Sequence, residues 1–461
     1  MCLRKELYTK IKIGGEVMNW TKLILFYLPL AVACTQQETP ISTTPQTSLA
    51  GDSSNVMLFE GGRLIVGDGN VIEDAAFLVE NGHFTQVGNS GSINAPDGAL
   101  QINISGKTII PALIDGHGHL GYSDVGARTD VRASYSRENI IDHLHRHAFY
   151  GHSATMSMGI DPLSMAELRE STIDNAARFL WAGRGIGRPN AGPGATDRRD
   201  VPYGIDTAEE GIAAVRELAE AQVDLVKIWV DDRNGTVEKL TPDLYGPIIQ
   251  EAHSLGLKVT AHIFYLEDAK DLLRAGVDGF AHGVRDVDVD DEFMELLANR
   301  PYTFLMPNLP NSGSTTIDDL PFFAQTLPAA GAETMRTEIS ESTTHTRFAV
   351  ESRNLKRMYD AGVPLIIGTD GDGAGWDIHE EIADMVLAGV SPADALASAT
   401  KNAAELYRLH DLGTISDGKS ADFIILDSNP LEDIKNTRAI SNVYIRGQEI
   451  NRAELSANWT G

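Results

Sequence analysis

The feature that most limits the fold is a regular alternation of short apolar runs and longer helical patterns between residues 111 and 407. Strands separated by helices favour parallel βαβ units over hairpins. A doubly wound open sheet is the rival, but no Gly-rich phosphate loop follows the first strand. Helical patterns include 206–222 and 266–276. Eight runs read as strands, the number in a TIM barrel: 109–116, 154–158, 179–184, 223–230, 258–263, 279–284, 302–307 and 364–369.

Short β patterns flank this region on both sides. Residues 57–66, 76–87 and 107–110 precede it, and 421–426 and 441–447 follow it. The Asn81-Gly82 pair is a strong hairpin signal. The fold class predicted is therefore α/β: a (β/α)₈ TIM barrel over 109–410 and a small β-sandwich domain that both chain ends form, over 56–108 and 411–453.

The first 34 residues read as an export signal. The apolar run 23–33 is shorter than the about 20 residues that span a membrane, but it has the length of a signal-peptide core. Residues 30–34 resemble the lipobox of bacterial lipoproteins, so Cys34 is the expected lipidation site. Residues 35–55 read as a flexible tether. We predict a membrane-anchored lipoprotein at the periplasmic or cell-surface side; a plain cleaved signal with Cys34 incidental is the alternative.

Charge and cysteine content exclude several classes of protein. The formal net charge of −27 repels phosphates, so nucleic acid is not an expected partner. The lipid anchor is the only membrane contact expected, and a homo-oligomer is compatible with the sequence. Cys2 and Cys34 both precede the folded region, which excludes a disulfide framework and cysteine ligation of a metal. Any metal must be held by His, Asp, Glu or a modified Lys.

Two histidines end the first predicted strand. His117 and His119 are two residues apart, and the period of a strand puts them on the same side. At the carboxyl end of a barrel strand, such side chains point into the active-site mouth. An H-x-H pair alone is weak evidence, because two hydrogen-bonded loop histidines give the same pattern.

A lysine interrupts the apolar run of the fourth predicted strand. Lys227 lies within Val223–Val230, and lysine is almost never buried without a partner. An ion pair with a barrel carboxylate would satisfy it. The alternative is a desolvated lysine with a depressed pKa, neutral enough to take up carbon dioxide and become an anionic carbamate.

Three more candidate ligands end later strands. His262 ends the fifth, His282 the sixth, and Asp370 the eighth. Each alone has an ordinary explanation, a core histidine or a helix cap. The joint pattern is much stronger, because strands one, four, five, six and eight each carry ligand candidates while two, three and seven carry none.

The order H-x-H, Lys, His, His, Asp resembles the binuclear branch of the amidohydrolase superfamily, especially its imidazolonepropionase-like and metal-dependent prolidase-like members. Residues 393–406 and 412–427 resemble that group's final barrel helix and its return to the β domain, and the likeness covers 56–452. The resemblance implies two divalent metals, with zinc expected. His117, His119 and Asp370 would hold the more buried metal, and His262 and His282 the outer one. Carboxylated Lys227 and a hydroxide would bridge them.

Such a site can hydrolyse several kinds of bond. The bridging hydroxide would attack a carbonyl, and Asp370 would pass a proton to the leaving nitrogen. An amide-type C–N bond in an N-acyl amino acid or dipeptide-like compound is therefore the first choice. A lactonase or phosphotriesterase could use the same site. A mononuclear deaminase needs no lysine on the fourth strand, and a noncatalytic surface binding lipoprotein needs no proton shuttle.

Several positions depart from the family's pattern or stay open. Ala281 stands where prolidase-like relatives often have Glu, and the loop 185–194 lacks a histidine common in them, which puts a C-terminal proline dipeptide in doubt. His143 and His147 have a metal-capable spacing but are read as a solvated helix face. Five residues in loops expected at the mouth are candidates for substrate contact: Tyr122, Arg188, Tyr265, Arg285 and His379.

Overall fold

The barrel predicted for the middle of the chain forms in the computed structural model, which describes residues 56–461. Its parallel strands lie in the order β6–β9–β10 and β13–β14–β15–β16. The first group contacts the second where the Asp224 N–H donates to the Trp181 carbonyl at 2.9 Å. The barrel strands are β6 (Leu113–Gly118), β9 (His152–Ser157), β10 (Arg178–Trp181), β13 (Val226–Val230), β14 (Val259–Ile263), β15 (Gly279–Ala281) and β16 (Phe304–Met306).

The eighth strand closes the ring through isolated bridges. Leu365 pairs with Leu305 of β16, and Gly371 pairs with Gly118 of β6, both in parallel. The predicted strand 364–369 is therefore an extended segment held at two points. The predicted strand 109–116 divides into β5 (Thr108–Pro111), which joins the terminal sheet, and β6. Pro111 lies at this break, where a residue without an N–H ends one ladder.

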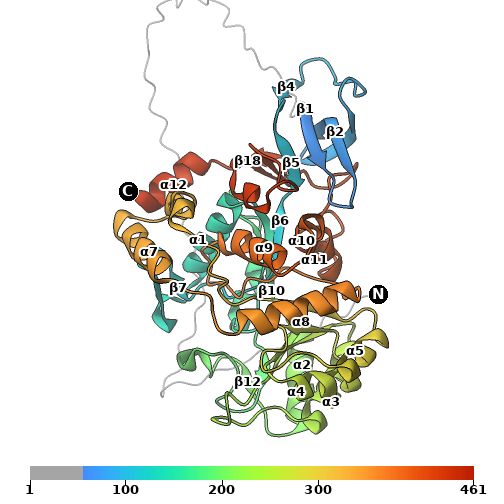
Figure 1. The fold of residues 1–461 in the computed structure, drawn as a ribbon, viewed down its shortest axis with the longest axis vertical. Helices are drawn as coiled ribbons and strands as arrows, with labels where there is room; N and C mark the ends of the chain where they lie inside the picture. Colours follow the sequence, from blue (N-terminus) through green and yellow to red (C-terminus); the bar gives the residue numbers. More distant parts are fainter. Residues whose placement is uncertain (1–55) are drawn as a thin grey trace, which may run out of the picture. The chain divides into compact units, whose positions relative to one another are not determined.

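Helices cover the outside of the barrel (Figure 1). The predicted helix 206–222 begins at a capping box, because Thr207 Oγ1 accepts the Glu210 N–H and the Glu210 carboxylate accepts the Thr207 N–H. Only the 3₁₀ turn Leu163–Leu168 follows β9. The helices around the barrel are α1 (Arg137–Phe149), α2 (Ala208–Glu220), α3 (Pro242–Ser254), α4 (Leu266–Ala275), α5 (Asp291–Ala298), α8 (Phe348–Asp360), α9 (Asp377–Leu387), α10 (Pro392–Ser398) and α11 (Lys401–Leu406), with α6 (Leu320–Phe323) and α7 (Ala329–Glu341) inserted between β16 and α8.

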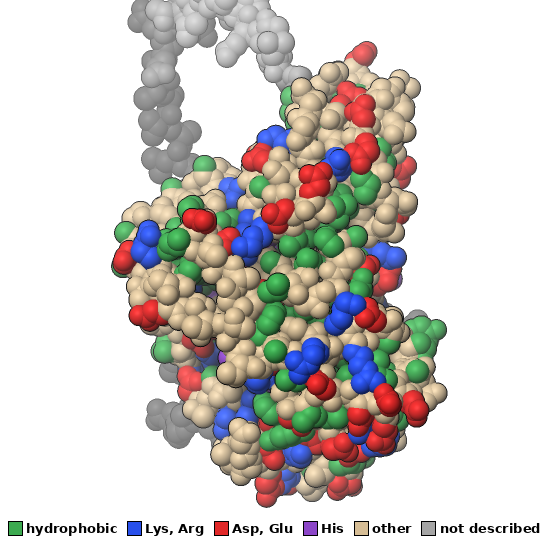
Figure 2. Space-filling model, in the orientation of Figure 1, with side chains coloured by type: hydrophobic (Ala, Val, Ile, Leu, Met, Phe, Trp, Pro, Cys, Tyr) green, Lys and Arg blue, Asp and Glu red, His purple; other side chains and the backbone are tan. Residues whose placement is uncertain are grey.

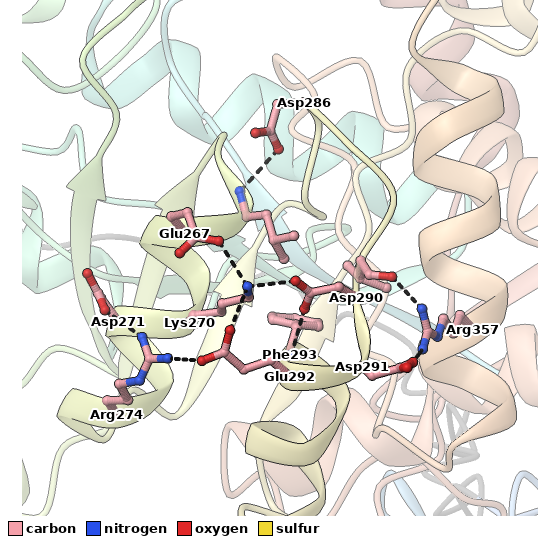
Figure 3. A network of polar contacts seen from close by, with 12 residues as sticks. Glu267, Lys270, Asp271, Arg274, Asp286, Asp290, Asp291, Glu292, Phe293 and Arg357 are labelled. Carbon is pink, nitrogen blue, oxygen red and sulfur yellow. Dashed lines mark hydrogen bonds and ion pairs between the residues drawn. The ribbon is translucent and has the colours of Figure 1, made fainter.

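Charged side chains connect two neighbouring helices of this outer layer (Figure 3). Lys270 of α4 is 3% exposed, and its Nζ donates to two carboxylates at the start of α5 and to one on its own helix. The distances are 2.9 Å to Glu267, 2.7 Å to Asp290 and 2.9 Å to Glu292. Asp290 also caps α5 by accepting the Phe293 N–H. The buried cation is thus fully paired.

Both ends of the described chain form one eight-stranded sheet, in which the blue β1 and β2 and the red β18 of Figure 1 take part. The Asn81-Gly82 hairpin is confirmed: both residues have positive φ, 50° and 80°, and they join β2 to β3. The order is β19-β18-β17-β5-β1-β2-β3, and β4 also pairs with β1. The strands are β1 (Val56–Ile65), β2 (Val71–Glu80), β3 (His83–Asn89), β4 (Leu100–Asn103), β17 (Phe423–Leu426), β18 (Ile440–Ile445) and β19 (Gln448–Glu449).

This sheet folds back on itself, as the predicted sandwich requires. In a flat sheet β2 and β17 would lie about 14 Å apart, three strand spacings. Their rings of Phe77 and Phe423 are instead 5.2 Å apart. The Phe84 N–H of β3 donates to the Lys419 carbonyl just before β17. One curled sheet therefore supplies both layers, and aromatic side chains such as Phe77 and Phe423 pack between them.

The C-terminal segment adds a helix that the sequence analysis did not assign. In α12 (Arg452–Thr460), Trp459 Nε1 donates to Asp142 of α1 at 2.7 Å. The signal, the tether and Cys34 lie outside the described residues, so these and the domain boundaries stay predictions. No helix within 56–461 is long and apolar enough to cross a membrane. Figure 2 shows that Asp and Glu side chains gather over the end of the molecule where α3–α5 lie.

Candidate active site

The six predicted ligand residues line one cavity of about 250 Å³, at the carboxyl ends of the barrel strands. His117 ends β6 and His119 follows it, Lys227 lies on β13 and His262 on β14, and His282 follows β15. Asp370 follows the eighth strand. Residues up to 253 positions apart in the chain thus converge because the barrel brings all strand ends to one face.

Asp370 lies at the centre of the imidazoles. Its Oδ1 is 3.0 Å from His119 Nε2 and 3.4 Å from His117 Nε2, and its Oδ2 is 4.0 Å from His282 Nε2. The ligand atoms of His117, His282 and Asp370 all lie within 4.8 Å of one another. The ring centroids of His262 and His282 are 4.6 Å apart. These spacings suit donors that surround a common metal centre.

Two of the six residues have a backbone conformation that side-chain-bearing residues rarely adopt. Asp370 has φ 54° and His282 has φ 141°. Such conformations cost on the order of 1–3 kcal/mol each and persist only where the surroundings enforce them. The backbone at both positions is therefore held in place by packing, which aims the side chains into the cavity.

The imidazoles have lone pairs to offer. His117 Nδ1 and Nε2, His119 Nδ1 and His282 Nδ1 are buried and have no hydrogen-bond partner among the described residues. Burial lowers the pKa of His117 and of His282 well below the usual value, with the nearby cationic side chains adding to the effect. Neutral, unpartnered imidazole nitrogens are the form in which histidine binds metals. The donor set therefore fits a divalent metal.

Lys227 is 1% exposed and has no hydrogen bond or ion pair within residues 56–461. Its Nζ lies 5.6 Å from the centroid of the Trp229 ring. Gly159 makes room for it, because a Cβ there would lie 2.9 Å from Lys227 Cγ. Burial is the largest cause that lowers the pKa of Lys227, to about 7. The amine is thus partly neutral near neutral pH, as carbamate formation requires.

A model of the amidohydrolase family matches residues 108–450 of this chain. The chain belongs to the amidohydrolase family. The resemblance inferred from the order of six residues is thereby confirmed, together with the prediction of an amidohydrolase-type enzyme. Members of this family generally use metal ions in their active sites. In this amidohydrolase, the cavity described above is where such ions could bind.

Relatives of this amidohydrolase span nearly its whole length. It is 26% identical to an imidazolonepropionase of Deinococcus radiodurans over 408 residues, 84% of this chain and 94% of the relative. A solved Xaa-Pro dipeptidase with bound methionine in its active site has a TM-score of 0.67 and 24% identity, over 86% of this chain and 99% of that one. Phenylurea hydrolase B has a TM-score of 0.68 and 20% identity, over 87% and 98%. The two structures support the barrel fold.

Two carboxylates that the sequence pattern did not indicate hydrogen-bond to candidate ligand residues of this amidohydrolase. Asp231 accepts the His262 Nε2–H at 2.9 Å. In the neutral ring, Nδ1 then carries no hydrogen, and its lone pair can bind a metal. Burial is the largest single influence and acts to raise the pKa of Asp231, but the hydrogen bond and charge of His262, together with the N–H and charge of Arg233, outweigh it and lower the pKa to about 2. Asp115 accepts the His117 N–H at 3.0 Å and the Thr369 hydroxyl at 2.8 Å, connecting the first strand to the eighth. The available signal was an acidic residue at the end of a predicted strand.

The cavity walls carry charges of both signs. Asp130 and Asp372 line one part of it, and Arg233 and Arg285 another. Arg198, 4% exposed, forms an ion pair with Asp130. None of these except Arg285 was predicted, because their place depends on loops whose paths the strand pattern does not fix.

Of the five predicted substrate residues, only Arg285 lines this cavity. The Tyr122 hydroxyl donates to the Ile160 carbonyl within the core, and the Tyr265 hydroxyl donates to Asp232. Arg188 forms ion pairs with Asp206 and Glu238 beside a separate surface cavity. The expectation that His379 lies in a loop at the mouth is wrong: it lies in α9, is fully buried, and its Nε2 donates to the Tyr150 carbonyl.

The solvated helix face predicted for His143 and His147 is also wrong. The two residues are 0% and 3% exposed. His143 Nδ1 accepts the Gly121 N–H at 3.0 Å and Nε2 donates to the Ser123 carbonyl. A Cβ at Gly373 would lie 2.0 Å from the His143 ring, so the loop after the eighth strand packs directly onto α1. Burial under this loop, which the helical spacing could not indicate, makes these histidines structural.

Proposed function

We propose that this enzyme hydrolyses an amide-type C–N bond in a small N-acyl amino acid or dipeptide-like compound. One observation carries the proposal: a single cavity at the mouth of the barrel is lined by six candidate side chains. Together they could hold two metals and move a proton. The two relatives named as a dipeptidase and a phenylurea hydrolase support it, since both names describe cleavage next to a nitrogen.

The proposed mechanism uses two metal positions. His117 and His119, with Asp370, would hold one divalent cation, and His262 and His282 would hold the other. Zinc suits these nitrogen and oxygen donors. Bound cations would supply a Lewis acid for the carbonyl and would lower the pKa of a water molecule. Asp231 accepts the His262 Nε2–H, so Nδ1 would be the nitrogen that binds the second metal.

Lys227 would connect the two positions as a carbamate. Its neutral amine adds to the carbon of carbon dioxide, an N–C bond forms, and one proton leaves. The product carries a negative charge on two oxygens, where the free lysine carries a positive charge on one nitrogen. The absence of any carboxylate partner among the described residues, together with full burial, suits this modification.

Asp370 would transfer the proton. Its Oδ1 lies 3.0 Å from His119 and its side chain is 42% exposed, so it reaches the cavity from the wall. It would accept a proton from the attacking water and deliver it to the leaving nitrogen. An amine leaves only when protonated, whereas an alcohol needs this help less. The placement of an acid–base group at the site therefore favours amides over lactones and phosphotriesters.

The test is a substrate screen on purified, zinc-loaded protein with N-acyl amino acids, dipeptides, lactones and a phosphotriester. We expect hydrolysis of at least one amide class, about two metal ions per chain by elemental analysis, and loss of activity on chelation that zinc restores. Preferred hydrolysis of lactones or phosphotriesters would reassign the substrate class. Hydrolysis unaffected by chelators, with no metal bound, would overturn the mechanism.

A further inference from the structure

Arg285 occupies a position between two cavities. It follows His282 by three residues, and its backbone N–H donates to the Phe264 carbonyl at 2.9 Å. It lines the metal-ligand cavity, and it also lines a second cavity of about 290 Å³. The second cavity is bounded by Asp231, Arg233, Asn234, Phe264, Arg285 and Arg347. The guanidinium therefore faces open space next to the groups that would carry out hydrolysis.

The guanidinium of Arg285 makes no hydrogen bond and no ion pair in the part of the chain that the structure describes. Its Nε is fully buried without a partner. The neighbouring arginines differ: Arg233 pairs with Asp231 at 3.1 Å, and Arg347 lies 3.7 Å from Glu351. An arginine loses hydration when it is buried, and unpaired burial is costly unless a ligand supplies the missing acceptor.

The charges around the cavity would orient an anion toward Arg285. Asp130 and Asp372 line another part of the metal-ligand cavity, and a carboxylate there would be repelled. The acidic charge of Asp130 is matched by Arg198, so no cation is left free on that side of the cavity walls described. Among the arginines that line this cavity, Arg198 and Arg233 form direct ion pairs, whereas Arg285 has only the longer-range charges of Glu351 and Asp370. Its guanidinium can therefore still donate to an anionic group.

We propose that Arg285 binds the carboxylate of the substrate, and that the substrate class is accordingly an amide whose leaving half is an α-amino acid. This rests on the proposed function, because it uses the same cavity. A planar guanidinium can donate two parallel hydrogen bonds to a carboxylate, which gives both affinity and a fixed orientation. The carbonyl is then held over the metal ligands while the carboxylate lies toward the second cavity.

The test measures binding of products, which avoids turnover. Calorimetry on the zinc-loaded protein would compare the binding of L-methionine and L-methioninol. Methioninol has a hydroxymethyl group in place of the carboxylate of methionine. We expect methionine to bind at least about tenfold more tightly, the equivalent of about 1.4 kcal/mol. Arg285→Met should abolish this preference. Arg285→Lys should keep part of it, because the charge stays and the paired donors are lost.

Arg188→Met is the matched control, since Arg188 is paired with acidic residues beside a different cavity. It should leave the preference for methionine intact. Equal binding of the two compounds by the unaltered protein, no binding of either, or a preference that survives in Arg285→Met would overturn the assignment. Failure of the proposed function shows separately, as an absence of amide hydrolysis in the screen; the binding comparison decides the role of Arg285 in either case.

Discussion

Lys227 and Lys270 are both nearly fully buried, at 1% and 3% exposure, yet their surroundings are opposite. Lys270 lies between α4 and α5, and three carboxylates within 2.9 Å accept its hydrogens (Figure 3). These hydrogen bonds raise its pKa. Lys227 lies at the mouth of the barrel with no carboxylate partner among the described residues, and burial lowers its pKa to about 7.

The difference shows that burial alone does not say what a charged residue does. Where carboxylates surround the ammonium, the charged form is stabilised and the residue connects two helices. Where they are absent, the neutral amine is favoured and a nucleophile results. Lys227 interrupts an apolar strand, whereas Lys270 lies in an acidic helical segment. Two of the three partners of Lys270 come from the start of α5, so the full contrast arises only when the chain folds.

The largest expected effect is on catalysis. Lys227→Met should lower kcat/KM by more than about 100-fold, because changes in residues that only support a metal ligand already cost about 10–100-fold. It should also lower the number of zinc ions bound per chain. Lys270→Met, the same substitution at equal burial, should leave kcat/KM nearly unchanged. A Lys227→Met enzyme with full activity and full zinc content would remove the carbamate from the mechanism.

The second effect concerns the carboxylate that supports a ligand. Asp231→Asn should weaken zinc binding by about 10–100-fold, since the amide cannot hold His262 in the same tautomer with the same strength. Competition with a chelator measures this. Asp232→Asn is the control, because within the described residues the neighbouring carboxylate accepts from the Tyr265 hydroxyl and not from a candidate metal ligand. Equal zinc affinity in the two variants would mean that Asp231 does not act through His262.

That the six candidate residues lie at one cavity was predictable, because strand ends carry a strong local signal. His117, His119 and Lys227 each interrupt or end an apolar run, and barrel topology brings such ends together. The boundary between the terminal sheet and the barrel was harder to predict. The apolar run 109–116 contains parts of two strands, because Pro111 lies where the chain passes from the terminal sheet to the barrel.

The charged surroundings were not predictable from the pattern. His143 and His147 have the spacing of an exposed helix face, but the loop around Gly373 buries them. Asp115 and Asp231 act through hydrogen bonds whose partners come from other strands. Whether a charged residue is paired depends on contacts between segments far apart in the chain, and periodicity reports only the side on which a residue lies.

The third effect is on stability: substitution of the two lysines should change the free energy of unfolding in opposite directions. In metal-free protein Lys227→Met should raise the free energy of unfolding by roughly 1–3 kcal/mol, because it removes a buried polar group without a hydrogen-bond partner. Lys270→Met should lower it, because three carboxylates lose their common donor. The midpoint of urea unfolding measures both. Destabilisation by Lys227→Met would show that the amine has a stabilising partner.

The smallest effect is the dependence of these changes on salt. The three carboxylates around Lys270 are about half exposed or more, with side-chain exposures of 78%, 47% and 54%, so ions can reach them. The screening length falls from about 10 Å at 0.1 M salt to about 3 Å at 1 M. The destabilisation caused by Lys270→Met should therefore shrink at the higher concentration, because the unaltered protein has more attraction to lose. The gain from Lys227→Met arises from desolvation inside the barrel and should change little. If both changes respond to salt alike, the two lysines share one electrostatic environment, and the contrast between a structural and a reactive lysine fails.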